Sequence, residues 1–258
     1  MVTTVFFDLD DTLLWDKKSI QMAFRATCQT VKQLDPEVFE QAVRAEATKL
    51  YQSYPTYPFT QMIGINPFEG LWGTFNDTGE DFEQMHQLMP DYQVNAWTNG
   101  LKACGIIDPM LGETLAKQFV SERKKHPYTY EETFDVLDQL KDDYQLLLLT
   151  NGAPSLQNTK LKITPEIAEY FKHIVISGDF GRGKPDPKIF EFALEKANTT
   201  AENVVMIGDN LMTDILGANR TGIKNIWINH HQQTAEQVKP TYEVKRLKEI
   251  LPILKALN

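Results

Sequence analysis

Three aspartates and a threonine follow directly on the first apolar stretch of this 258-residue chain. Val5–Phe7 runs into Asp8, Asp10, Asp11 and Thr12. A buried strand that ends in carboxylates is unfavourable, because each charge taken out of water costs several kcal/mol unless a cation or hydrogen-bond donors compensate. Oxygen-only ligands favour Mg²⁺ or Ca²⁺, and Mg²⁺ is the ion that usually works beside a phosphate. The segment therefore predicts a cation site, with a simple turn or helix cap as the alternative interpretation.

The elements that must position these acids are strands alternating with helices. Short apolar runs without alternation indicate strands that are buried on both faces. Strands that alternate with helices predict an α/β fold with a doubly wound parallel sheet. The predicted strands are Val5–Phe7, Gln145–Leu149, Ile174–Ile176, Val204–Ile207, Asn225–Ile228 and a short last one at Tyr242–Val244.

Further reactive groups lie where later strands end. Thr150 ends the second predicted strand, Asp209 follows the fourth, and Lys184 lies in the loop beyond the third. Ligands of open α/β sheets bind outside the carboxyl ends of the strands. Each residue alone could be a cap, a turn residue or a solvated lysine. Together with Asp8, they predict one crevice that holds two acids, a hydroxyl and an ammonium group.

Residues 16–126 show a different, helical pattern. Ser19 is the expected cap of a first helix and Asp35, followed by proline, the cap of a second. Residues 51–79 read as an irregular connection with short helical pieces, and further helices are expected over 81–89, 94–103 and 109–125. Thr129 and Glu132 have capping-box spacing before the next helix. We therefore predict a core domain of residues 1–15 and 127–258 and a helical domain of residues 16–126.

The composition excludes several classes of protein. The net charge is −9 and the sequence pI about 5.1, which argues against binding to nucleic acids or anionic membranes. Cys28 and Cys104 have no metal-ligand spacing and are expected to be packing residues in a reducing compartment. The N-terminus resembles no signal peptide and no apolar run reaches membrane-spanning length. We expect a cytoplasmic protein with a small-molecule substrate, either a monomer or a weak homo-oligomer.

Four segments resemble the ordered motifs of the haloacid dehalogenase (HAD) superfamily, specifically its phosphatases. The segments are DLDDT at Asp8–Thr12, TNG at Thr150–Gly152, GKPDP at Gly183–Pro187 and GDNLMTD at Gly208–Asp214. The resemblance covers the first 14 or so residues and the region from about His126 onward. The helical insertion is similar in position and character to the family's cap domain. The resemblance implies a Rossmann-like core and Mg²⁺-dependent hydrolysis of a phosphomonoester.

The resemblance also implies a role for each motif residue. Asp8 would be the nucleophile that forms an aspartyl-phosphate, and Asp10 the general acid and base for the two half-reactions. Mg²⁺ would be held by Asp8, the main-chain carbonyl of Asp10, and Asp209. Phosphate would be bound by Thr150, Asn151, Gly152 and Lys184. Supporting roles are expected for Asp214, Asn210 and Thr12.

Three other functions are alternatives to a phosphatase. A dehalogenase has no leaving alkoxide to protonate and usually lacks the second aspartate, so the presence of Asp10 favours a phosphatase. A phosphomutase similar to β-phosphoglucomutase stays open. A non-catalytic, phosphate-binding regulatory module also stays open, although such relatives tend to lose the nucleophile or the acid, and both are present here.

Substrate selection is expected to reside in the helical domain, acting as a lid over the crevice. Most of the candidate aromatic residues could equally be domain core, and Arg123–Lys125 could be a solvated helix end. The five histidines lack metal-ligand spacing and are expected to be structural or surface residues: His86, His126, His173, His230 and His231. The candidates for specificity are Trp15, Lys17, Tyr51, Tyr54, Tyr57, Phe59, Phe68, Trp72, Arg123, Lys124 and Lys125.

Overall fold

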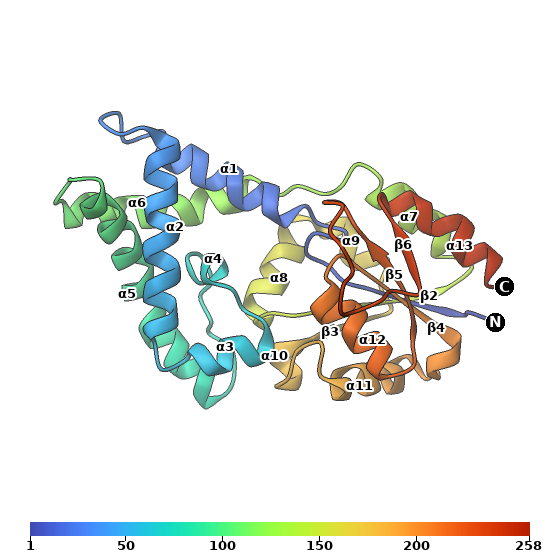
Figure 1. Cartoon of the computed structure of the whole chain (residues 1–258). Coiled ribbons are helices and arrows are strands. Elements are labelled where there is room, and N and C mark those ends of the chain that lie inside the picture. The colour runs from blue at the N-terminus through green and yellow to red at the C-terminus, as the bar shows by residue number, and fades with distance from the viewer. The chain divides into compact units, whose positions relative to one another are not determined.

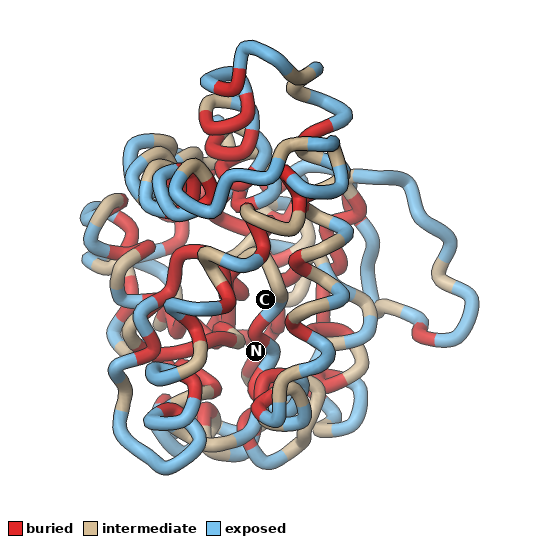
Figure 2. Tube along the Cα trace, turned by 90° about the vertical axis from the view of Figure 1, so that its left-hand side faces the viewer, coloured by how far each residue is buried: buried red, intermediate tan, exposed pale blue.

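The computed structural model describes all 258 residues, and the chain forms two compact units (Figure 1). The sheet unit comprises Met1–Trp15, Thr129–Gly152 and Thr164–Asn258. The helical unit comprises Asp16–Tyr128 and Ala153–Ile163. Red stretches of the tube in Figure 2 mark the buried residues, and apolar side chains form a core cluster in each unit.

The sheet has six strands in the order β3-β2-β1-β4-β5-β6, and every neighbouring pair is parallel. This confirms the predicted doubly wound α/β fold. The chain builds outward from β1 on one side and then returns to build on the other, which creates the switch point where such sheets bind ligands. The strands are β1 (Thr4–Phe7), β2 (Gln145–Thr150), β3 (His173–Ile176), β4 (Val204–Gly208), β5 (Lys224–Ile228) and β6 (Tyr242–Val244).

The register places the ends of the three central strands side by side. Phe7 at the end of β1 is aligned with Leu148 of β2 and with Ile207 of β4. The Asp8 N–H still donates to the Ile207 carbonyl at 2.9 Å, so the first catalytic candidate is held by the sheet ladder itself.

Helices cover both faces of the sheet, with α11 and α12 on one side and α7 and α13 on the other (Figure 1). Asp186 caps α11 by accepting a hydrogen bond from the Lys188 N–H, and the helix packs Ile189 and Phe190 onto the apolar side chains of the strands. The helices of this unit are α7 (Thr133–Leu140), α9 (Pro165–Glu169), α10 (Ser177–Phe180), α11 (Pro187–Ala197), α12 (Leu216–Arg220) and α13 (Ile250–Ala256).

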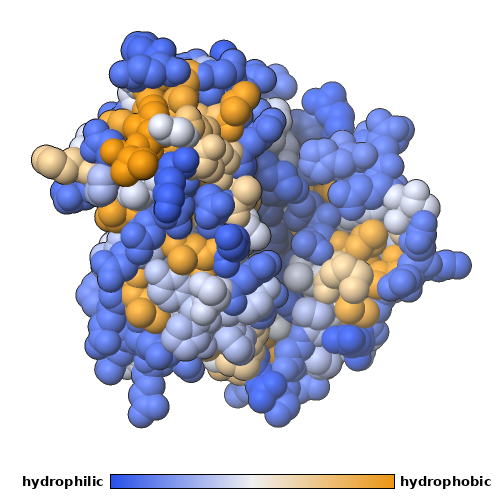
Figure 3. Space-filling model, turned by 60° about the vertical axis from the view of Figure 1, so that its left-hand side comes forward, coloured by the Kyte–Doolittle hydropathy of each residue, from blue (hydrophilic) through white to orange (hydrophobic).

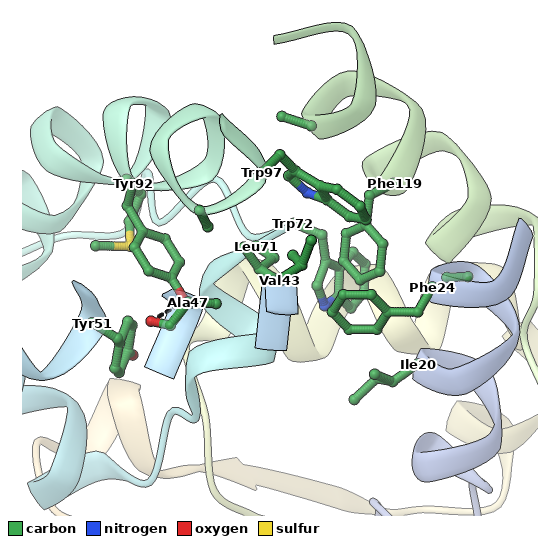
Figure 4. Packing of buried hydrophobic residues seen from close by; sticks show 14 of the residues in the cluster. Ile20, Phe24, Val43, Ala47, Tyr51, Leu71, Trp72, Tyr92, Trp97 and Phe119 are labelled. Atoms are coloured by element: carbon green, nitrogen blue, oxygen red, sulfur yellow. Dashed lines mark hydrogen bonds between the residues drawn. The ribbon is translucent and has the colours of Figure 1, made fainter. Parts of the chain in front are cut away.

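The helical unit has a core rich in aromatic side chains (Figure 4). The rings of Phe24 and Phe119 lie 4.6 Å apart between centroids, and Trp97 packs against both. Tyr92 is fully buried, and its hydroxyl donates to the Pro67 carbonyl at 2.7 Å. The helices are α1 (Asp16–Cys28), α2 (Pro36–Ser53), α3 (Tyr57–Ile63), α4 (Pro67–Gly70), α5 (Glu80–Ala103), α6 (Pro109–Lys125) and α8 (Pro154–Ile163).

Two helix predictions in this unit were wrong. The segments 81–89 and 94–103 form one helix, α5, that continues through Pro90. Proline removes one helical hydrogen bond, but buried side chains before and after it, including Met89 and Tyr92, anchor both halves in the same core. Helix α1 begins at Asp16, so Ser19 is inside the helix, where its hydroxyl accepts from the Tyr128 N–H at 3.1 Å.

Two further differences concern the return to the sheet. Thr129 does not cap a helix but forms an isolated antiparallel bridge with Leu14, and α7 begins at Thr133. Helix α8 was not predicted at all, because its sequence has a weak apolar periodicity. It packs with the helical unit, although the sequence-based division assigned these residues to the core domain.

The surface fits the acidic composition. Hydrophilic residues cover most of the face seen in Figure 3, and apolar areas are interspersed among them. Apart from Met1, the most exposed large apolar side chains are Ile107, between α5 and α6, and Met110, at the start of α6. No helix is both long and apolar enough to cross a bilayer.

Candidate functional site

Asp8 lies at the centre of a buried cluster of charges at the carboxyl edge of the sheet. Carboxylate oxygens of Asp8, Asp209 and Asp214 all lie within 4.8 Å of one another. Asp8 follows β1 and Asp209 follows β4, while Asp214 lies in the π-helical turn Leu211–Ile215. The sheet therefore brings together acids that are about 200 residues apart in the sequence.

Lys184 supplies the positive charge of this cluster. Its Nζ lies 2.6 Å from Asp8 Oδ1 and 2.7 Å from Asp214 Oδ1, and it donates to the Leu149 carbonyl at 2.7 Å. The lysine side chain is only 2% exposed. A buried ammonium with three oxygen partners has little freedom to move, so its charge is fixed beside Asp8.

The charges perturb one another strongly. Burial would lower the pKa of Lys184, but the nearby carboxylates of Asp214 and Asp8 raise it, so the lysine stays cationic. Burial raises the pKa of Asp8 well above its ordinary range, and Lys184 opposes this effect. Asp214, Asp209 and Asp10 raise the Asp8 pKa further by repulsion. A further cation at this position would favour the ionised form of Asp8.

Asp214 is held in place by its surroundings. While Oδ1 pairs with Lys184, Oδ2 accepts the Asn210 N–H at 3.1 Å. The Asn210 side chain caps the π-helical turn by accepting the Met212 N–H at 2.9 Å. Gly208 is required here, because a Cβ at that position would lie 2.2 Å from Asp214 Oδ2. Asp214 and Asn210 therefore orient Lys184, and both Asp214 oxygens have partners within the protein.

The donor set suits a hard divalent cation. It consists only of oxygens, and its acidic members outnumber the single lysine. Oxygen ligands of this kind fit Mg²⁺ better than zinc or other soft metals. Both carboxylate oxygens of Asp214 are in contact with Lys184 or Asn210, so Asp8 and Asp209 are the candidate ligands of such a cation.

Thr150–Gly152 lie beside Lys184 and show one feature that sequence reasoning missed. Asn151 holds the main chain of Lys184 with two hydrogen bonds: its Nδ2 donates to the Lys184 carbonyl at 2.9 Å and its Oδ1 accepts the Lys184 N–H at 2.8 Å. Gly152 donates its N–H to Ser177 Oγ at 2.8 Å. Thr150 is fully buried at the end of β2. The Asn151 side chain thus sets the position of the lysine, and Ser177 fixes the loop.

The segment after Asp8 turns back on itself. The Leu13 and Leu14 N–H groups donate to the Leu9 carbonyl at 3.0 and 2.9 Å, and the Asp11 N–H donates to Leu14 at 2.6 Å. Asp11 has a φ of 60°, a left-handed conformation that aspartate tolerates better than most residues. The buried Thr12 hydroxyl lies 3.4 Å from Asp8 Oδ2. This turn places Asp10 close enough to Asp8 for the two charges to interact.

Most of the predicted specificity residues belong to the core of the helical unit. Tyr51 and Trp72 are buried, and four more aromatics pack partly buried against the same cluster: Tyr54, Tyr57, Phe59 and Phe68. Contrary to the expected solvated helix end, the Arg123 side chain is only 2% exposed and is paired with Asp16. Lys17, Lys124 and Lys125 are exposed, and Trp15 belongs to the sheet unit.

The fold and the site define a class of protein: a doubly wound α/β protein with an aspartate nucleophile candidate, a buried lysine and an acidic cation site. Comparison with known proteins agrees. Residues 2–222 match the family model of haloacid dehalogenase-like hydrolases. This chain therefore belongs to the haloacid dehalogenase-like hydrolases.

Several relatives have assigned names. The chain is 30% identical to the phosphoserine phosphatase of Thermus thermophilus, over 95% of this chain and 96% of that protein. It is 36% identical to the pyrimidine 5′-nucleotidase YjjG of Escherichia coli, over 75% of this chain and 93% of that protein. Its fold matches a crystal structure of the HAD-hydrolase YfnB from Bacillus subtilis bound to magnesium, with a TM-score of 0.67, 24% identity and 98% coverage of both chains.

Proposed function

We propose that this chain is a Mg²⁺-dependent phosphomonoester hydrolase that acts on a small phosphorylated metabolite. The observation that supports this most directly is the buried Lys184, held between Asp8 and Asp214 beside Asp209. A phosphate dianion approaching a cluster of carboxylates would otherwise be repelled. The named relatives hydrolyse phosphomonoesters, which favours hydrolysis over mutase or dehalogenase chemistry.

Asp8 is the proposed nucleophile. Its carboxylate oxygen forms a bond to phosphorus while the bond from phosphorus to the leaving oxygen breaks, giving an aspartyl-phosphate. Asp10 gives a proton to the leaving oxygen and then takes one from the water that hydrolyses the aspartyl-phosphate. The two residues thereby divide the nucleophilic and the acid–base work between neighbouring positions of one turn.

The remaining residues neutralise and orient the phosphate. Lys184 and the Thr150 hydroxyl would hold its oxygens, assisted by the main-chain amides of Asn151 and Gly152. Mg²⁺, held by Asp8, the Asp10 carbonyl oxygen and Asp209, would offset the negative charge shared by the acids and the phosphate. Helical residues 16–126 would act as the cap that selects the substrate.

The test is hydrolysis of a panel of phosphorylated metabolites and 4-nitrophenyl phosphate, with Mg²⁺ and with EDTA. Wild-type protein should release inorganic phosphate only with Mg²⁺, and Asp8→Asn should lower kcat by at least about a thousandfold. Asp142→Asn, an exposed aspartate of the sheet unit, is the matched control and should leave kcat unchanged. Wild-type activity no greater than that of Asp8→Asn across the whole panel would refute the proposal.

A further inference from the structure

His230 lies at the same edge of the sheet as the site residues. It lies two residues beyond the end of β5, whereas Asp209 and Asp8 come directly after β4 and β1. Three hydrogen bonds fix the turn that carries it: the Asn229 N–H donates to Val244 at 2.7 Å, and the Asn229 side chain donates to Glu243 Oε1 at 2.7 Å and to the Gln233 carbonyl at 2.9 Å. The position of the imidazole is therefore determined by β5 and β6.

The imidazole of His230 contacts the turn that follows Asp8 and carries Asp10. Its Nε2 lies 3.2 Å from the main-chain carbonyl oxygen of Asp11. A carbonyl oxygen can only accept a hydrogen bond, so Nε2 must carry the proton and donate it. Asp11 is the residue with the left-handed φ of 60°, and it directly follows Asp10.

Three stacked rings also link His230 to the end of this turn. The ring of Tyr130 lies parallel to that of His230, with centroids 4.4 Å apart and planes 13° apart. Trp15 stacks on Tyr130 with centroids 5.3 Å apart and the same angle. The Tyr130 N–H also donates to Leu13 at 3.3 Å. The turn is thus held at Asp11 by a hydrogen bond from His230 and at its end by Trp15.

We infer that His230 is a positioning residue, which uses its Nε2–H bond to the Asp11 carbonyl to hold Asp10 in the geometry needed for proton transfer. The inference rests on the proposed function, because it assigns an orienting partner to the proposed general acid. The ring stack supplies a fixed platform for this bond. A residue in a left-handed conformation has nearby alternatives of lower strain, and a hydrogen bond to its carbonyl disfavours them.

The experiment compares two substrates that differ in their need for a general acid. Phenol is a much weaker acid than 4-nitrophenol, so its departure from phosphate depends more on protonation by Asp10. The kcat/KM value reports the steps up to departure of the leaving group. His230→Phe keeps a stacking ring and removes the donor, while His230→Gln keeps a donor and removes the ring. The matched control is His231→Phe, the same change at the exposed neighbouring residue.

His230→Phe should lower kcat/KM for phenyl phosphate by about tenfold or more and for 4-nitrophenyl phosphate by less than about threefold. His230→Gln should recover much of the loss, and His231→Phe should match the wild type on both substrates. An equal loss on both substrates, a loss in His230→Gln as large as in His230→Phe, or no loss at all would overturn the inference. Urea unfolding shows whether His230→Phe folds. If it does not, the ratio of the kcat/KM values for the two substrates in His230→Gln decides, and a ratio close to that of the wild type is expected. A wild-type protein inactive on both substrates and on the whole panel of phosphorylated metabolites would instead refute the proposed function.

Discussion

Replacing Lys184 with methionine should lower the free energy of unfolding by about 3–5 kcal/mol at pH 8 in EDTA, because a buried charge network loses the cation that pairs with both Asp8 and Asp214. Methionine keeps the length of the side chain and removes the ammonium group. The carboxylate oxygens of Asp8, Asp209 and Asp214, which lie within 4.8 Å of one another, would then repel without the ammonium group beside them. At an effective dielectric constant of about 20, each charged pair at that distance repels by roughly 3 kcal/mol.

The loss should depend on pH with a definite sign. Burial raises the pKa of Asp8, so as the pH falls the folded protein binds a proton before the unfolded chain does. Stability therefore rises as the pH falls through the folded-state pKa, and it falls as the pH rises. The difference between Lys184→Met and the wild type should shrink from pH 8 toward pH 5, because protonated carboxyls no longer repel.

Urea unfolding followed by circular dichroism measures the effect. Asp214→Asn and the double variant complete a double-mutant cycle, and the two sites should couple by at least about 1 kcal/mol, because the asparagine removes one of the repelling charges. Millimolar Mg²⁺ should return part of the stability lost in Lys184→Met. The control is Lys188→Met, an exposed lysine four residues away, which should stay within about 0.5 kcal/mol of the wild type. A loss below about 1 kcal/mol, or additive effects at Lys184 and Asp214, would refute the reasoning.

Two predictions concern the helical unit. The Lys160 side chain is 1% exposed and its Nζ lies 2.8 Å from Glu69 Oε1, so Lys160→Met should lower the free energy of unfolding by about 3–5 kcal/mol. Adding Glu69→Gln should reduce that loss, and additive losses in urea unfolding would contradict the pairing. Burial raises the pKa of Cys28 to about 12, whereas Cys104 is only partly buried, so Ellman's reagent at pH 8 should modify Cys104 first and Cys28 only after unfolding. Equally fast reaction of both thiols in the native protein would contradict this order.

The succession of strands along the chain could be predicted from the sequence, because a strand buried on both faces is a continuous apolar run and five such runs are separated by helical segments. The edge of the sheet that carries the candidate site could be predicted as well, because a polar residue directly after a buried strand is unusual unless it has a partner or a ligand there. Asp8, Thr150 and Asp209 were found in this way. The same rule applied to β5 would have pointed to His230, which sequence reasoning assigned to a structural or surface role.

The course of the helical segment could be read only in part. Separate helices over 81–89 and 94–103 were predicted, but packing of Met89 and Tyr92 into one core keeps α5 continuous through Pro90. Arg123 was expected either to contribute to specificity or to lie at a solvated helix end, but it is buried and its partner Asp16 lies 107 residues away in the sequence. Helix propensity and charge are local properties, whereas the burial of a side chain depends on what covers it.

The sequence by itself determined the class of fold, the strand ends that carry the candidate site residues and the family, because these depend on local pattern and on the types of residues at fixed spacing. Only the tertiary structure decided which residues of the site form hydrogen bonds and ion pairs with one another. Asn151 supports the Lys184 main chain, Asp214 shares the lysine with Asp8, and His230 donates to the Asp11 carbonyl. A hydrogen bond requires an approach of about 3 Å, and whether distant segments approach so closely is settled by the packing of the whole sheet rather than by any one stretch of chain.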